Sequence, residues 1–174
     1  GADNDNAIAL NYATITPAGN GFSVTDQETG EVLSVSTRAL VNATGAWLDD
    51  TMEGLGVRSG EKLVSGTKGS HLILDNPALM NALRGHMVYF ENTDGRVCIV
   101  FPYLGKVLAG ATDIRVKQVG RVRCEDDERD YILNSLRLIF PQLTISETDI
   151  VYSYSGIRPL PTADVEFTGR ISRE

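Results

Sequence analysis

Short runs of apolar and β-branched residues, separated by turn-forming residues, predict that the chain begins as sheet. Four such runs occur in the first 45 residues: Ala9–Ile15, Gly21–Val24, Val32–Ser36 and Ala39–Ala43. The segment Asp26–Gly30 separates two of them and contains a glycine, as expected of a hairpin loop.

The same pattern returns in the second half of the chain. Strands are predicted at Ser70–Leu74, Met87–Phe90, Val97–Phe101, Val107–Ala111 and Ile150–Ser155. The segment Asn92–Arg96 contains Asp-Gly and joins two of these strands as a hairpin would. The pairing is therefore expected to be largely antiparallel.

A short helix is predicted directly after Gly45. Trp47, Leu48, Met52 and Leu55 recur there at helical intervals. Such a helix would bury its apolar side and end near the glycine that follows Leu55.

Two further helices have clear boundary signals. Asn76 is a favoured N-cap before a proline at the first helical position, which predicts a helix at Pro77–Leu83. The longest helix is predicted at Asp126–Phe140, where Ile132 and Leu136 share one side and acidic residues fill the first turn. Together these elements indicate an α+β fold, with a mixed, largely antiparallel sheet and helices on one face.

Composition narrows the function classes. The 174 residues carry a formal net charge of −7, and their basic residues are scattered, which argues against a nucleic-acid surface. A small anionic partner stays open, because two or three convergent cations in a pocket matter more than the total charge. The two cysteines, Cys98 and Cys124, indicate neither a metal site nor a disulfide framework. This cysteine usage fits a reducing, cytoplasmic setting best. No apolar stretch approaches the length of a membrane helix, and no signal sequence is recognised.

Two segments in the first half could bind a ligand. Asn42–Gly45 ends an apolar run and opens a helix, so its backbone N–H groups could meet a phosphate or a ribose, although an ordinary strand-to-helix turn has the same pattern. Lys68–His71 brings together a cation, a glycine, a hydroxyl and an imidazole, which suits either a ligand site or a polar strand entrance with a hydrogen-bonded histidine. Strand alternation sends Lys68 and Ser70 to one face and His71 to the other, unless Gly69 forms a bulge.

Two segments in the second half are also candidates. Gly110–Asp113 ends a strand with small residues and a threonine, which suits either a pocket floor or a simple turn. In Tyr152–Leu160, Gly156 and Pro159 flank Arg158, so its guanidinium is well held for a phosphate or carboxylate, or equally for a structural salt bridge.

In this order, the segments resemble the FAD-dependent glycerol-3-phosphate dehydrogenase and α-glycerophosphate oxidase family, within the glycine/D-amino-acid oxidase group. The resemblance is carried by Val41–Trp47 (V-N-A-T-G-A-W), Lys68–His71 (K-G-S-H), Phe101–Pro102, Gly110–Asp113 (G-A-T-D) and Gly156–Leu160 (G-I-R-P-L). Ala46 stands where the family usually has proline, and Ala111 where it usually has threonine.

The resemblance implies that the chain is the central, substrate-facing part of a longer enzyme. Residues 1–45 would be strands leading to a flavin-contacting turn, 46–161 the substrate-binding domain, and 162–174 a tail toward the missing part of the FAD-binding domain. FAD would belong to the full-length enzyme and would not be retained by this fragment, which alone is predicted to be inactive.

The resemblance also assigns roles to individual residues. His71 and Arg158 are the expected catalytic residues, and Arg158 would also bind the substrate anion. Further substrate contacts are expected from Lys68, Ser70 and Thr112. Cofactor contacts are expected from the backbone of Ala43, Thr44 and Gly45.

The implied reaction is oxidation of sn-glycerol 3-phosphate to dihydroxyacetone phosphate by hydride transfer to FAD, with quinone or oxygen as electron acceptor. Peripheral association with the inner face of the cell membrane and a homo-oligomer are both compatible with the resemblance. The alternatives are a related FAD-dependent enzyme acting on a 2-hydroxy acid or an amino acid, and a non-catalytic module that kept the fold.

Overall fold

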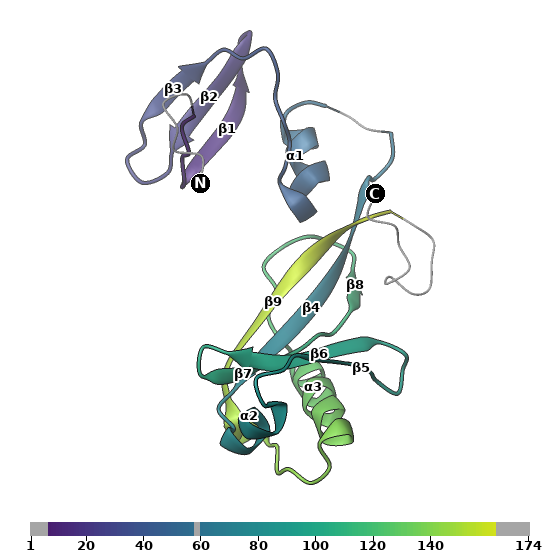
Figure 1. Ribbon diagram of the computed structural model, residues 1–174. Coiled ribbons are helices and arrows are strands. Elements are labelled where there is room, and N and C mark those ends of the chain that lie inside the picture. The colour runs from purple at the N-terminus through teal and green to yellow at the C-terminus, as the bar shows by residue number, and fades with distance from the viewer. Residues whose placement is uncertain (1–6, 58–59, 163–174) are drawn as a thin grey trace. The chain divides into compact units, whose positions relative to one another are not determined.

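The structure is a computed structural model that describes residues 7–57 and 60–162 (Figure 1). By its contacts the chain divides into two compact units, and the boundary between them in the sequence lies between Lys62 and Leu63. The regions predicted from the sequence were defined by role rather than by contacts, so their boundaries at residues 45 and 161 stay predictions. Residues 163–174 of the predicted tail lie outside the described residues.

The first unit contains a three-stranded antiparallel sheet in the order β1-β2-β3. Its strands are β1 (Ala13–Ala18), β2 (Gly21–Asp26) and β3 (Val32–Val35). The predicted hairpin loop is confirmed: the carboxylate of Asp26 accepts hydrogen bonds from the amides of Glu28 and Thr29, which fixes the turn between β2 and β3.

The predicted strand at Ala39–Ala43 is wrong, since no regular element is assigned between β3 and Gly45. Leu40 and Val41 are exposed there, and no described strand pairs with them. The expected helix does form, as a 3₁₀ turn η1 (Gly45–Trp47) followed by α1 (Leu48–Gly54).

The second unit contains a six-stranded sheet built around one long central strand. The strands are β4 (Val64–Leu74), β5 (Val88–Glu91), β6 (Val97–Tyr103), β7 (Lys106–Gly110), β8 (Ile114–Val116) and β9 (Ile150–Pro161). On one side β4 pairs with β7 and β8, and β6 and β5 continue the sheet beyond β7. On the other side β9 runs along the whole of β4 (Figure 1). Every recorded pairing is antiparallel.

Helices cover one face of this sheet and bury its core. They are α2 (Pro77–Leu83) and α3 (Asp126–Ile139), with a 3₁₀ turn η2 (Glu147–Asp149) before β9. The core comprises Leu72, Leu74, Leu79, Leu83, Val100, Val107, Ala109, Ile132, Leu133, Leu136 and Ile145. The α+β class predicted from the sequence is confirmed.

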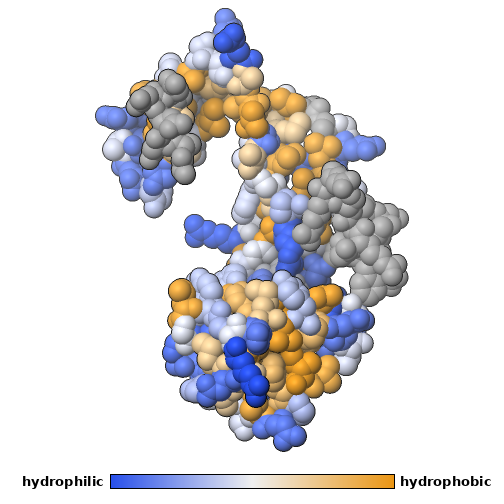
Figure 2. Space-filling model, viewed as in Figure 1, coloured by the Kyte–Doolittle hydropathy of each residue, from blue (hydrophilic) through white to orange (hydrophobic). Residues whose placement is uncertain are grey.

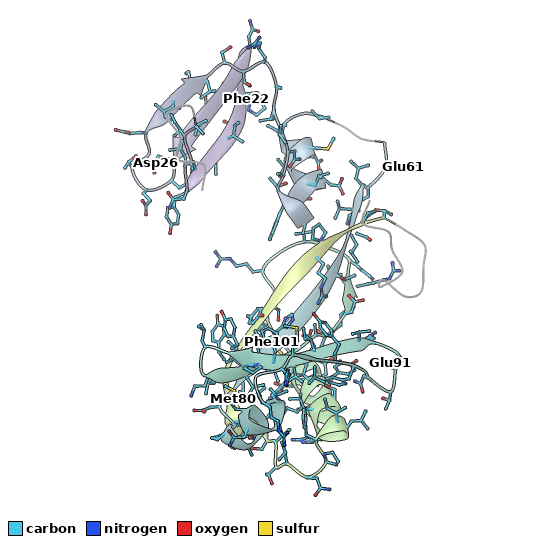
Figure 3. All side chains as sticks on the ribbon, viewed as in Figure 1. Phe22, Asp26, Glu61, Met80, Glu91 and Phe101 are labelled. Carbon is cyan, nitrogen blue, oxygen red and sulfur yellow. The ribbon has the colours of Figure 1, made fainter. Side chains whose placement is uncertain are left out.

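The opposite face of the sheet carries a different set of side chains. Strand register places Phe101, Leu108 and Ile73 next to one another on this face. Each is adjacent in sequence to a core residue of its own strand, and successive side chains of a strand point to opposite faces. Figure 3 labels Phe101 on β6 and Met80 on α2. Met80 packs against the core on the helix side of the sheet. Hydrophobic residues are visible at the surface of both units (Figure 2). Tyr152 on β9 is 61% exposed.

Candidate functional site

Strand β4 presents different chemistry on its two faces. Lys68 and Ser70 point toward α3, whereas Gly69 and His71 point to the opposite side. The register between β4 and β9 is unbroken from Val64 to Ile73, so no bulge at Gly69 brings these side chains together. We call the side away from α3 the open face. It carries Thr67, Gly69, His71, Tyr154 and Arg158.

On the α3 side, the carboxylate of Glu128 is the centre of a buried polar network. Glu128 is 2% exposed. Its Oε1 accepts from the hydroxyls of Ser70 and Thr112, each at 2.7 Å. Its Oε2 lies 2.5 Å from Lys68 Nζ and accepts from the Glu125 amide at 3.0 Å. These bonds occupy about four acceptor positions, the capacity of a carboxylate, and therefore fix its orientation.

The same contacts set the ionisation of Glu128. Burial raises the pKa of its carboxyl, but the hydrogen bonds from Lys68, the Glu125 amide, Ser70 and Thr112 outweigh burial and hold the pKa below its ordinary value. The network is thus an anion surrounded by donors, with Lys68 supplying the balancing charge.

Thr112 joins the network to the open face. Its hydroxyl, besides donating to Glu128, accepts from the Ser70 amide at 2.9 Å. Its carbonyl oxygen accepts from Nη1 of Arg158 at 3.2 Å. One residue therefore contacts the buried carboxylate through its side chain and the open-face arginine through its backbone.

Arg158 lies on β9 with its guanidinium over Gly69. A Cβ at Gly69 would overlap the guanidinium, so only glycine leaves room for the arginine in this position. Asp113 Oδ1 is a second, longer acceptor at 3.5 Å. Within residues 7–57 and 60–162, Nη1 is the only atom of this guanidinium with a recorded acceptor, and the side chain is 34% exposed. Most of its donor capacity is therefore left for a ligand.

His71 is the neighbouring titratable group on the open face. Its ring stacks on Tyr154, with centroids 5.0 Å apart and an interplanar angle of 8°. Gly110 provides the space on its other side, since a Cβ there would overlap the imidazole. Burial lowers the pKa of His71, and the positive charge of Arg158 lowers it further. The imidazole is therefore neutral at physiological pH.

Two buried polar atoms on the open face have no hydrogen-bond partner among the described residues. They are Nδ1 of His71 and Oγ1 of Thr67. Both atoms are closed to solvent, so a ligand on the open face would contact other atoms of these side chains.

In the first unit, the turn at Asn42–Gly45 is held by its own side chains. Asn42 Oδ1 accepts from the amide and the hydroxyl of Thr44, and its Nδ2 donates to the Leu48 carbonyl. Gly45 has φ near +61°, a conformation that favours glycine. Ala43 and Thr44 are exposed, so their backbone is accessible where η1 begins.

These motifs lie within a known family pattern. The family model described as FAD dependent oxidoreductase matches residues 4–173. The chain belongs to this family. The resemblance stated from the motifs is thereby confirmed.

The chain is also similar in sequence to two bacterial enzymes. One is a glycerol-3-phosphate dehydrogenase from Synechocystis, 34% identical over 185 residues, a match that covers 96% of this chain and 33% of the relative. The other is the aerobic glycerol-3-phosphate dehydrogenase of Bacillus subtilis, 34% identical over 155 residues, a match that covers 88% of this chain and 27% of the relative. The chain therefore spans about a third of the length of these relatives.

One solved structure is also similar to this chain in its fold. The X-ray structure of the glycerol-3-phosphate dehydrogenase from Bacillus halodurans complexed with FAD has a TM-score of 0.74 and 29% identity. It covers 88% of this chain, which corresponds to 32% of that protein.

The structure groups some of the residues predicted as site residues and separates others. His71 and Arg158 share the open face, and Thr112 reaches it through its carbonyl. Lys68 and Ser70 contact Glu128 on the other side of the sheet. The predicted roles of all five residues stay predictions.

Sequence reasoning missed three residues of this region. Glu128 left a signal, because it lies four residues before Ile132 on the apolar side of α3, where a buried acid requires partners. Tyr154 and Arg115 have no such signal in the sequence, because only the strand register brings them beside β4. Tyr154 lies opposite His71, and Arg115 lies opposite Thr67.

Proposed function

We propose that this chain supplies the substrate-facing residues of a flavoenzyme that oxidises sn-glycerol 3-phosphate to dihydroxyacetone phosphate. The observation that carries the proposal is the pairing on the open face of two groups, an arginine with most of its donors uncommitted and a half-buried histidine whose pKa is lowered. One group suits the phosphate and the other the reacting hydroxyl.

Arg158 binds the phosphate. A guanidinium presents paired N–H donors that match two phosphate oxygens, and its contact with the Thr112 carbonyl keeps the group from rotating away. Arg115, placed by register on the same face beside Thr67, is a second cation within the sheet. Lys68, committed to Glu128, provides charge from behind the sheet rather than a direct contact.

His71 accepts the proton of the C2 hydroxyl. Its lowered pKa keeps the imidazole neutral and able to act as a base, and stacking on Tyr154 fixes the plane of the ring. The chemistry that FAD would supply when bound is a hydride acceptor for C2. The reaction then balances: the alcohol loses a hydride and a proton and becomes a ketone.

The residues expected to hold FAD are Ala43, Thr44 and Gly45. The exposed backbone of this turn at the start of η1 fits a phosphate or ribose of the cofactor. Quinone or oxygen is the proposed electron acceptor. No helix within the described residues is long and apolar enough to cross a membrane.

The experiment that tests the proposal is anaerobic reduction of the flavin in the full protein that carries this sequence. Glycerol 3-phosphate is expected to bleach the visible flavin absorbance rapidly, whereas 2-hydroxy acids and amino acids leave it unchanged. Bleaching only by a 2-hydroxy acid or amino acid would instead mean that Arg158 binds a carboxylate. A flavin that none of these compounds reduces would contradict the proposal.

His71 makes the reaction dependent on pH. Because its pKa is lowered from 6.5, kcat/KM for glycerol 3-phosphate is expected to be level above about pH 6.5 and to fall as the pH drops through the lower value and the base is protonated. The His71→Asn variant should lose this inflection and about 100- to 10,000-fold in rate. His86→Asn, which changes an exposed histidine, is the control. An inflection that survives in His71→Asn would exclude His71 as the base.

Gly69→Ala tests the position of the guanidinium without removing it. The new Cβ overlaps the Arg158 guanidinium, the flexible end of a side chain, so the arginine shifts while the fold is kept. We expect kcat/KM to fall by about tenfold or more, because small misplacements of binding groups are costly. The control is Gly156→Ala, directly across the ladder, where a Cβ meets no atom within 4 Å. Equal effects of the two substitutions would contradict the role of Gly69.

A further inference from the structure

Arg158 needs a fixed acceptor to hold its guanidinium over Gly69, and that acceptor lies in a loop. Thr112 lies between β7 and β8, outside either strand, so strand pairing alone does not hold its carbonyl. What holds it is a set of side-chain and backbone contacts to β4 and α3. The Ser70 amide donates to its hydroxyl at 2.9 Å, and its own amide donates to the Ser70 carbonyl at 3.4 Å.

The strongest of these contacts is the bond from the Thr112 hydroxyl to Glu128. It is 2.7 Å long, ends on a carboxylate, and lies in a region where both residues are 2% exposed. Hydrogen bonds to charged groups are roughly twice as strong as neutral ones, and burial strengthens them further. Glu128 therefore determines where Thr112 can lie.

Glu128 is itself fixed by elements on both sides. It is the third residue of α3, and its Oε2 closes the capping box by accepting from the Glu125 amide. Lys68 and Ser70 of β4 hold the same carboxylate from the sheet. The start of α3, the middle of β4 and the loop after β7 are thus joined at one group.

We propose that Glu128 and Thr112 are positioning residues that hold Arg158 in its substrate-binding orientation through the Thr112 carbonyl. This rests on the proposed function, in which Arg158 binds the substrate anion. Neither residue touches the substrate in this scheme: Glu128 fixes Thr112, and Thr112 fixes the guanidinium.

The test is a double-mutant cycle between Thr112 and Arg158 in the full protein that carries this sequence, with kcat and KM for glycerol 3-phosphate normalised to bound flavin. Thr112→Val keeps the shape of the side chain and removes the hydroxyl. Thr112→Ser keeps the hydroxyl and serves as the rescue variant. Using Thr112 avoids dependence on Glu128 variants, in which a buried lysine loses its partner and folding itself is at risk.

Thr112→Val is expected to raise KM and lower kcat/KM by about tenfold, while Thr112→Ser stays within about twofold of the wild type. In the Arg158→Ala background, Thr112→Val is expected to change kcat/KM by no more than about twofold, because the group that it positions is gone. A merely structural role would lower the flavin content or the amount of folded protein and leave KM unchanged.

The outcomes separate the two proposals. The same loss from Thr112→Val with and without Arg158, or no loss at all, overturns the positioning role alone. An unchanged kcat/KM in Arg158→Ala overturns the binding role of Arg158 and the positioning role together.

Discussion

An Arg158→Ala variant of the full protein that carries this sequence is expected to lose kcat/KM for glycerol 3-phosphate by a factor of about 30 to about 5,000, equivalent to about 2–5 kcal/mol. Truncation removes the guanidinium from the open face and leaves the substrate phosphate without its main cation.

Steady-state kinetics of three variants would measure this effect. Arg158→Lys keeps the charge but not the planar donor pair, so we expect it to recover only part of the loss. Arg123→Ala removes a surface arginine whose side chain is 85% exposed and is the matched control. A kcat/KM for Arg158→Ala equal to that of Arg123→Ala would remove Arg158 from the site.

Helices with local boundary signals could be predicted from the sequence. The predicted limits of α2 agree with the structure, where the Asn76 side chain accepts from the Leu79 amide as an N-cap does. The predicted α3 differs from the observed helix by one residue at its end. Both predictions rest on contacts within a few residues of the chain, which the sequence itself specifies.

Strands could be predicted less well, because a strand depends on a partner that the local sequence does not reveal. Ala39–Ala43 has a suitable composition but pairs with no described strand, whereas the three residues of β8 are ordered by pairing with Gly66–Lys68. The last strand, β9, extends beyond the predicted Ser155 to Pro161, since β4 is long enough to pair with all of it.

In the candidate site, too, local features could be predicted from the sequence, whereas contacts between distant positions could not. Alternation along β4 predicted that His71 and Lys68 face opposite ways, which the unbroken register confirms. The contacts that give these residues their chemistry join positions far apart in the chain: Lys68 with Glu128, and His71 with Tyr154. Pairings of this kind follow from the topology of the sheet, so a single sequence does not specify them.

The buried network makes a strong prediction for stability. Replacing Glu128 with alanine leaves the Lys68 ammonium, on a side chain that is 11% exposed, without its anion, and the Ser70 and Thr112 hydroxyls without their common acceptor. Breaking a buried ion pair in this way is expected to lower the free energy of unfolding by about 3–5 kcal/mol. Asp126→Asn, on the same helix but with a side chain that is 90% exposed, should change it little.

The dependence on pH identifies the charge as the cause. Because the folded pKa of Glu128 lies below its ordinary value of 4.5, its ionisation contributes stability that is fully present above that value and is lost as the pH falls through the folded pKa. Urea unfolding of the chain, followed by circular dichroism, should therefore show the largest difference between wild type and Glu128→Gln near neutral pH and a smaller one in acid.

A second substitution, Lys68→Met, should recover part of the loss in Glu128→Ala, since no unpaired charge then remains buried. If the difference were the same at every pH and Lys68→Met added its own full penalty, the network would act through packing and not through the Lys68–Glu128 pair.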